Sequence, residues 1–254
     1  MRIALAQINS VIGDFERNFA VINEFSLRAY EELKADIVFF PELSVCGYPP
    51  MDLLDQNCFT ELNIQTVCRL QRSLPKNIAV GVGFVNRTPY SHGKALVNEY
   101  GIIRNGGLVF EQIKTLLPTY DVFDEARNFE PAQSWKVYEF NNSKLGIAVC
   151  EDVWRETDIP GTSYLQDPVS MLLKQGISVL AVPSASPFIA GKLQIRQGLA
   201  KRISLRGSTS VVYINAVGAN DSIIFDGRSF VMSAAGEIIA EAKAFEEDLI
   251  AVDI

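Results

Sequence analysis

Histidine is almost missing from this sequence, and its scarcity narrows the possible mechanisms. A single His occurs among 254 residues. It is His92, in the segment Pro-Tyr-Ser-His-Gly, which is typical of an exposed turn. Most mechanisms built on histidine are therefore excluded, and so is any zinc site that needs two or more His ligands. No metal site is expected, and the proton acceptor of a nucleophilic mechanism must be a carboxylate or an amine.

Cysteine and long apolar runs are also scarce. The four cysteines, Cys46, Cys58, Cys68 and Cys150, show no close CxxC spacing and are too few for a disulfide framework in a chain of this length, so we expect free thiols. The N-terminus, MRIALAQ, has no long apolar run and no small-residue cleavage site. Neither secretion nor a membrane span is predicted, and we expect a cytoplasmic protein.

Basic residues are fewer than acidic ones in this sequence. Lys and Arg number 23 against 30 Asp and Glu, which gives a formal net charge of -7. Nucleic acid and anionic membranes are therefore disfavoured as principal partners, because both favour a clustered excess of Lys and Arg. The one basic stretch, 192–206, is short, and we interpret most of it as the solvated face of a helix.

Short apolar and β-branched segments recur along the chain and predict close to ten buried strands. Apolar residues behind the potential N-cap Asp14 predict a long amphipathic helix, and further helices are predicted at 60–74, 168–175 and 192–206. This pattern indicates an α/β fold, and no linker divides the chain, so residues 1–254 are predicted to form a single domain. The predicted strands are 3–6, 37–40, 78–84, 94–100, 145–149, 178–182, 210–214, 229–232, 237–240 and 249–252.

Cys150 ends one of these strands, in Leu-Gly-Ile-Ala-Val-Cys-Glu-Asp-Val-Trp. A strand end followed by a turn presents a side chain at the rim of a sheet. If a helical turn starts there, its backbone amides could lower the pKa of the thiol and stabilise an oxyanion. The alternative is an inert structural thiol, which is common in apolar strands. The cysteine alone does not decide between them.

Two charged residues in otherwise apolar segments could supply the missing proton acceptor. Glu42 follows the predicted strand 37–40 and the strand-breaking Pro41, although it could be an ordinary surface residue. Lys114 lies in Gln-Ile-Lys-Thr-Leu-Leu-Pro, where a lone lysine needs a carboxylate partner or a route to water. Glu42 and Lys114 are the natural partners for a nucleophilic Cys150.

Three segments, Pro-Glu42-Leu-Ser-Val-Cys-Gly-Tyr, Lys114 with Leu-Pro, and Val-Cys150-Glu-Asp-Val-Trp, closely resemble the signatures of the nitrilase (carbon-nitrogen hydrolase) superfamily. The resemblance spans essentially the whole chain. It implies a four-layer αββα sandwich of the nitrilase type. It also implies a catalytic triad of Glu42, Lys114 and Cys150 that cleaves amide or nitrile bonds through a thioester.

Finer matches at 114–129, 184–188 and 225–230 resemble the N-terminal glutaminase domain of glutamine-dependent NAD synthetases. That resemblance implies L-glutamine as substrate, no cofactor for its hydrolysis, and a homo-oligomer. It also implies a C-terminal synthetase domain in cis, which alone would use ATP and Mg²⁺ and whose Ser-Gly-Gly loop does not occur here. It assigns glutamine contacts to Tyr120, Glu151, Ser186 and Lys192, and a supporting role beside Lys114 to Glu125.

Four of these assignments have a simpler interpretation: Tyr120 could only pack, Ser186 could only shape a turn, Lys192 could belong to the basic helix face, and Glu125 could simply cap its loop. Two other functions also stay open. One is a free-standing amidase for an ω-amide or carbamoyl substrate. The other is a non-catalytic assembly module, in which the αββα domain serves as an oligomer interface.

Overall fold

The computed structural model describes residues 1–154 and 164–254 and contains two six-stranded sheets. The first sheet runs in the order β14-β1-β2-β3-β4-β5, with β1, β2 and β3 parallel and the outer pairs antiparallel. Its strands are β1 (Arg2–Gln7), β2 (Ile37–Phe39), β3 (Ala79–Arg87), β4 (Leu96–Arg104), β5 (Gly107–Ile113) and β14 (Asp248–Asp253).

The second sheet repeats the plan of the first, with a parallel centre of β7, β8 and β9 in the order β13-β12-β9-β8-β7-β6. A separate hairpin joins β10 to β11 beside the sheets. These strands are β6 (Val137–Phe140), β7 (Ser143–Ile147), β8 (Val179–Ser184), β9 (Ser210–Asn215), β10 (Val217–Asn220), β11 (Ile223–Asp226), β12 (Phe230–Met232) and β13 (Ile238–Glu241).

The two sheets pack face to face through an apolar core. On β1, Ile3 and Leu5 face the opposite sheet, while Ala4 and Ala6 face the helix layer. Ile147 of β7 and Ile214 of β9 enter the same inter-sheet cluster from the other side. Strands that are buried on both faces read as continuous apolar runs, which is why the sequence revealed the central strands.

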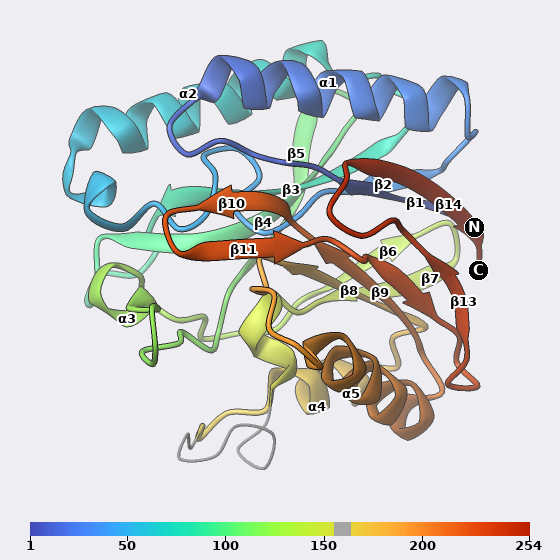
Figure 1. The fold of residues 1–254 in the computed structure, drawn as a ribbon. Helices are drawn as coiled ribbons and strands as arrows, with labels where there is room; N and C mark the ends of the chain where they lie inside the picture. The colour runs from blue at the N-terminus through green and yellow to red at the C-terminus, as the bar shows by residue number, and fades with distance from the viewer. Residues whose placement is uncertain (155–163) are drawn as a thin grey trace.

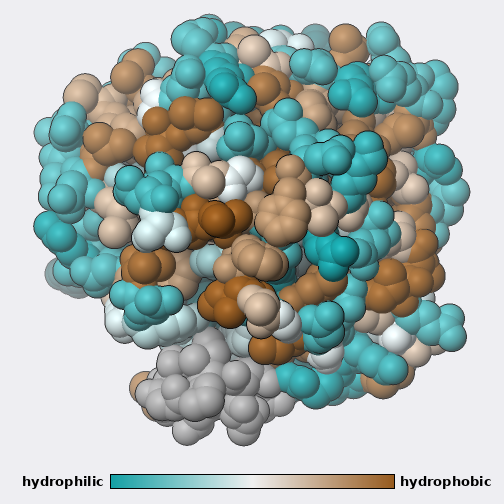
Figure 2. Space-filling view, in the orientation of Figure 1, coloured by the Kyte–Doolittle hydropathy of each residue, from teal (hydrophilic) through white to brown (hydrophobic). Residues whose placement is uncertain are grey.

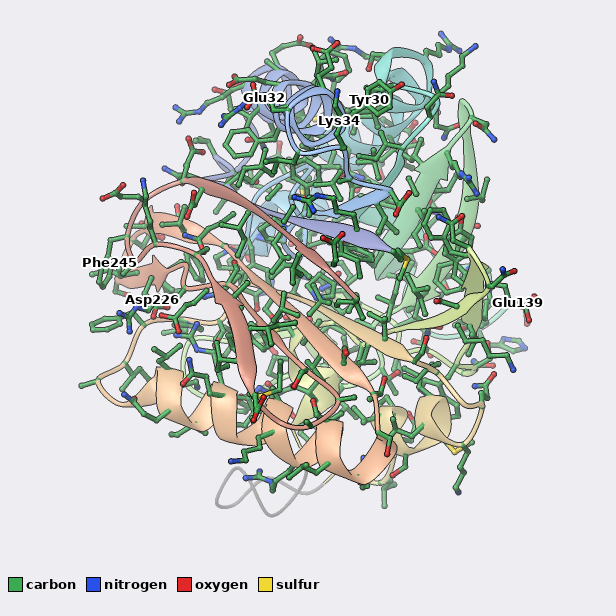
Figure 3. All side chains as sticks on the ribbon, turned by 90° about the vertical axis from the view of Figure 1, so that its right-hand side faces the viewer. Tyr30, Glu32, Lys34, Glu139, Asp226 and Phe245 are labelled. Carbon is green, nitrogen blue, oxygen red and sulfur yellow. The ribbon has the colours of Figure 1, made fainter. Side chains whose placement is uncertain are left out.

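Helices cover the outer face of each sheet, which gives the four layers visible edge-on in Figures 1 and 3. Helices α1 and α2 cover the first sheet, and α4 and α5 cover the second. Asp14 caps α1 as predicted, by accepting a hydrogen bond from the Arg17 amide. The helical segments are α1 (Phe15–Glu31), η1 (Met51–Asp55), α2 (Asn57–Ser73), α3 (Glu125–Asn128), η2 (Cys150–Val153), α4 (Pro168–Leu173) and α5 (Lys192–Gly207).

The structure confirms the α/β sandwich and refines several details. The predicted number of strands was too low, because the sequence did not reveal β5, β6, β10 and β11. The prediction of a solvated basic helix face was wrong for Arg196. This residue is fully buried in α5, and its guanidinium pairs with the Asp226 carboxylate at 2.6 Å. Within 1–154 and 164–254, no helix is long and apolar enough to cross a membrane.

One end of the two sheets gathers the polar side chains. Glu42 follows β2, Lys114 follows β5, Cys150 follows β7 and Ala185 follows β8. The carboxyl ends of these strands meet at this end because β1 to β3 are parallel, β7 to β9 are parallel, and β5 runs in the direction of β3. Ligand sites of α/β folds form at such strand ends. On the face with the β10–β11 hairpin, apolar side chains gather near the centre (Figure 2).

Candidate active site

Cys150 is the first residue of η2, in the strained turn that follows β7. Its φ is +48°, in the left-handed region that non-glycine residues rarely adopt. Such strain persists where the surrounding structure fixes the backbone, and it is frequent at functional sites. The thiol is half-buried, whereas Cys46 is buried and Cys58 and Cys68 are exposed. All four are free thiols, as the sequence predicted.

The carboxylate of Asp152 fixes this turn to the neighbouring sheet. It accepts hydrogen bonds from the amides of Thr115 and Leu116, at 2.9 and 2.7 Å, and from the amide of Val149, at 3.0 Å. Two of these amides directly follow Lys114, and the third directly precedes Cys150. The buried carboxylate therefore holds the Cys150 turn in register with the segment that follows Lys114.

Lys114 lies between two carboxylates. Its Nζ is 2.7 Å from Glu42 Oε1 and 2.7 Å from Glu125 Oε1. The side chains of Glu42, Lys114 and Glu125 are 0%, 1% and 6% exposed. Lys114 therefore has two carboxylate partners, where the sequence predicted a need for one. Glu42 is buried and is not an ordinary surface residue.

Asn98 and Tyr48 complete this cluster, and the sequence analysis assigned a role to neither. Asn98 Nδ2 donates to Glu42 Oε1 at 2.8 Å and, at 3.5 Å, to Glu125 Oε2. The Tyr48 hydroxyl donates to Glu125 Oε1 at 2.7 Å. Asn98 could have been noticed in the sequence, because it lies in the predicted strand 94–100 and a buried side-chain amide needs polar partners.

The charges of the cluster follow from burial and from one another. Burial alone would lower the pKa of Lys114, but the Glu125 and Glu42 carboxylates outweigh it and raise that pKa well above its usual range. Burial and, less strongly, the Glu42 carboxylate raise the pKa of Glu125 to about 7, against the opposing charge of Lys114. The lysine is therefore a fixed cation.

The Cys150 thiol is protonated at rest. Burial raises its pKa well above the ordinary value, and the Glu42 carboxylate raises it further, while Lys114 and the Ala185 amide favour the thiolate. The helical turn η2 does start at Cys150, but the pKa of the thiol is raised and not lowered, because burial and the Glu42 charge outweigh the groups that favour the thiolate. A thiol of this kind needs a base before it can attack, and the Glu42 carboxylate is close enough to influence its pKa.

Beside Cys150, Glu151 forms a second polar group with two tyrosines. The Tyr120 hydroxyl donates to its carboxylate at 2.9 Å, and the hydroxyl of Tyr164, a residue not singled out from the sequence, donates at 2.7 Å. Burial raises the pKa of Glu151, while these two hydrogen bonds and the charge of Lys192 favour its ionised form. Lys192 Nζ itself lies 4.8 Å from the centroid of the Trp154 ring. A buried carboxyl group and a nearby cation thus stand next to Cys150.

Ser186 lies in the loop after β8, one residue beyond Ala185. It is buried, and its backbone is held in both directions by Asn215: the Ser186 amide donates to Asn215 Oδ1 at 2.8 Å, and Asn215 Nδ2 donates to the Ser186 carbonyl at 3.2 Å. The preceding amide, that of Ala185, donates to Glu42 Oε2 at 3.2 Å. The backbone of this loop therefore contacts the buried cluster through Glu42.

Small cavities adjoin the cluster. One of about 20 Å³ is lined by Glu42 and Tyr48 and shares Asn220 with a hollow of about 580 Å³ between η1 and the β10–β11 hairpin. Among the described residues, no group of three or more His, Cys, Asp or Glu side chains is arranged to hold a metal ion.

Comparison with known proteins gives one family. A family model described as carbon-nitrogen hydrolase matches residues 2–254. The glutamine-dependent NAD(+) synthetase of Synechocystis sp. is 38% identical over 253 residues, which cover 97% of this chain and 45% of that protein. The chain thus spans less than half the length of this relative.

Solved structures agree with the fold. The glutamine-dependent NAD+ synthetase of Acinetobacter baumannii, in complex with ADP, superposes with a TM-score of 0.88 at 33% identity and covers 98% of this chain and 44% of its own. An amidase of Nesterenkonia AN1 from the nitrilase superfamily has a TM-score of 0.84 at 24% identity, over 100% of this chain and 90% of its own. The second likeness concerns the fold alone.

Proposed function

The chain belongs to the carbon-nitrogen hydrolase family, and from this premise we propose that it hydrolyses the side-chain amide of L-glutamine. The observation that carries the proposal is the buried cluster of Glu42, Lys114 and Glu125 beside the strained Cys150. It provides a base, a fixed cation and a nucleophile without histidine or metal.

In the first half-reaction Glu42 takes the thiol proton and the sulfur of Cys150 attacks the amide carbon. The carbon–nitrogen bond then breaks, the nitrogen receives the proton from Glu42, and ammonia leaves a thioester on Cys150. In the second half, Glu42 takes a proton from water and the resulting hydroxide attacks the thioester. The carbon–sulfur bond then breaks, the sulfur of Cys150 takes the proton back from Glu42, and glutamate is released. Atoms and charge balance over the cycle, and Glu42 and Cys150 return to their starting states.

Lys114 and the backbone amide of Glu151 stabilise the oxyanion of each tetrahedral intermediate. The lysine suits this role because its two carboxylate partners keep it charged and its side chain is almost fully buried. Removing one oxyanion donor from an enzyme commonly lowers kcat by about 100-fold or more. Asp152 contributes by holding the lysine and the cysteine turns together.

Glutamine is favoured over a simple amide by the charges beside Cys150. We assign the α-ammonium group to Glu151, whose carboxylate is oriented by Tyr120 and Tyr164, and the α-carboxylate to Lys192, which rests over Trp154. Ser186 completes the contacts to the amino acid. A buried anion and a cation near one another match the two opposite charges of an amino acid.

The product ammonia is proposed to serve ATP-dependent amidation of deamido-NAD to NAD by a synthetase domain joined in cis. Two relatives named as glutamine-dependent NAD synthetases are more than twice as long as their match to this chain, which supports such a partner. The cavity beside Glu42 and the hollow that shares Asn220 with it offer space into which ammonia could depart.

The substrate assignment is tested by ammonia release from three amides: glutamine, glutaramic acid, which lacks the α-amino group, and 4-aminobutanamide, which lacks the α-carboxylate. Glutamine should be preferred. Lys192→Gln should lower kcat/KM for glutamine by about 10- to 100-fold, as for the loss of one charged hydrogen bond, and leave 4-aminobutanamide unaffected. The matched control is Lys201→Gln, which alters an exposed lysine of the same helix.

Equal rates on all three amides would indicate a free-standing amidase instead. No release from any amide, together with no labelling of Cys150 by a thiol-reactive glutamine analogue, would indicate a non-catalytic assembly module.

The ammonia acceptor is tested by adding the synthetase domain of a longer relative, ATP and deamido-NAD to the 254-residue chain. We expect slow hydrolysis by the chain alone and faster hydrolysis with all three additions, because coupled sites activate each other by a shared free energy. Equal rates in every condition would contradict the coupling and leave only the hydrolase.

A further inference from the structure

Asn98 contacts both carboxylates of the cluster and is almost completely buried, at 1% exposed. It lies in β4, and its carbonyl accepts the Lys114 amide at 2.9 Å. Its side chain donates to Glu42 Oε1 at 2.8 Å and to Glu125 Oε2 at 3.5 Å. One residue therefore joins the backbone of the lysine to both of its counter-ions.

The two oxygens of Glu42 are not equivalent. Oε1 accepts from Lys114 Nζ at 2.7 Å and from Asn98, whereas the donor recorded at Oε2 is the Ala185 amide at 3.2 Å. The Ala185 amide also interacts with the Cys150 sulfur, so Oε2 and the sulfur share one neighbour. A carboxylate oxygen that already has two strong donors is a poor proton acceptor, which leaves Oε2 as the basic atom.

We propose that Asn98 is a positioning residue, which holds Glu42 through Oε1 so that the ionised carboxylate presents Oε2 to the Cys150 thiol. This inference rests on the proposed hydrolase function. It differs from that function in assigning the orientation of the base to a residue that touches no substrate.

The state of the Asn98 amide supports a role beyond packing. Its Oδ1 is buried and has no hydrogen-bond partner among the described residues. Rotating the amide by half a turn would place that oxygen against the two carboxylates, where acceptor faces acceptor. The carboxylates therefore fix the orientation, although it leaves a buried oxygen unpaired, which a purely structural amide would avoid.

Loss of the Asn98 donor should be visible in the pH dependence of thiol reactivity. The titratable groups that face Glu42 are Lys114, Glu125, Cys150 and Tyr48. The hydrogen bond favours the ionised carboxylate, so its removal makes the base easier to protonate. The acidic limb of any process that needs Glu42 as base should then move to higher pH.

The experiment compares Asn98→Ala and Asn98→Leu with the unaltered protein in two measurements. The first is alkylation of Cys150 by iodoacetamide as a function of pH, which needs no glutamine. The second is kcat and KM for glutamine. We expect the acidic limb of alkylation to move up by about one pH unit. We also expect kcat to fall by about 10- to 100-fold, as for loss of one hydrogen bond to a charged group, with KM changed little.

The matched control is Asn86→Ala. Asn86 lies on the neighbouring strand β3 and donates to the carboxylate of Glu99 at 2.8 Å, the same type of contact outside the site. It should leave both measurements unchanged. If neither the unaltered protein nor any variant hydrolysed glutamine, but the Asn98 variants still shifted the pH dependence of alkylation, the proposed substrate would be wrong and the role of Asn98 would stand.

Three results would overturn the proposal. The first is that the acidic limb of Cys150 alkylation stays at the original pH in both Asn98 variants, and the second is that Asn86→Ala shifts it equally. The third is a rise in KM for glutamine with unchanged kcat, which would make Asn98 a substrate contact. Asn98→Leu fills the volume of the amide, so it guards against loss of the fold through a cavity. Failure of both variants to fold would assign Asn98 a structural role instead.

Discussion

The Lys114 ammonium and the Glu42 carboxylate form a buried ion pair, with Nζ and Oε1 2.7 Å apart and side chains 1% and 0% exposed. Removing two charges from water is costly unless they are paired and further hydrogen-bonded. Glu125 and Asn98 supply those additional contacts. The folded protein therefore keeps a charged lysine and a paired carboxylate next to Cys150, because losing either partner would leave an uncompensated buried charge.

Cys150→Ala should abolish amide hydrolysis and leave the fold intact. The change removes the proposed nucleophile and only a small side-chain volume. Ammonia release reports the activity and circular dichroism the fold. Cys46→Ala, Cys58→Ala and Cys68→Ala are the controls and should retain activity. Substantial ammonia release by the Cys150 variant would remove that residue from the mechanism.

Glu42→Gln should lower kcat by about 100-fold or more, because the amide preserves the shape of the carboxylate but cannot accept a proton. Binding of glutamine should change much less, and calorimetry on the variant measures it directly. Lost binding together with normal turnover at saturating glutamine would identify Glu42 as a substrate contact and not the base.

Lys114→Met should abolish activity and also destabilise the protein. It leaves Glu42 and Glu125 as two uncompensated carboxylates in a buried site, a change that typically costs about 3–5 kcal/mol. Urea denaturation at neutral pH measures the loss. Lys201→Met, at an exposed position of α5, should change the free energy of unfolding by less than about 0.5 kcal/mol. Equal stability of the two variants would show that the buried pair carries little net energy.

Glu99→Gln should stabilise the protein at alkaline pH. Burial raises the pKa of Glu99 from 4.5 to about 7, against the hydrogen bond from Asn86. The folded state therefore binds the proton more tightly than the unfolded state, so this carboxyl favours folding at low pH and its contribution is lost as the pH rises through about 7. Gln cannot ionise, so the variant should gain on the order of 1–3 kcal/mol over the unaltered protein at pH ~8 and nearly nothing below pH ~4.5.

The control for this prediction is Glu139→Gln, which alters an exposed glutamate of the adjacent sheet (Figure 3). Urea denaturation across this pH range should give the same free-energy difference from the unaltered protein at every pH. A Glu99 variant that behaved in the same way would show that the buried carboxyl does not titrate abnormally.

Several functional contacts could not be read from the sequence because they join distant segments. Asn98 and Glu42 are separated by 56 residues, and Tyr48 and Glu125 by 77. Local patterns of hydrophobicity carry no information on which strand ends will meet. Tyr164 and Asp152 are similar cases: each makes hydrogen bonds that depend on where another element lies.

The sequence by itself determined the α/β class and the central strands, and it singled out Glu42, Lys114 and Cys150 as candidate catalytic residues. Apolar runs specify buried strands, and Glu42, Lys114 and Cys150 are residues whose burial or placement at strand ends needs a reason. The tertiary structure decided the protonation states and the partners. Burial and the Glu42 charge raise the pKa of the Cys150 thiol, and they outweigh Lys114 and the Ala185 amide, which favour the thiolate. The tertiary structure also decided that Lys114 has two carboxylate partners and that Asn98 connects them, since only the packing of β4 and β5 beside the turn after β2 brings these side chains within hydrogen-bonding distance.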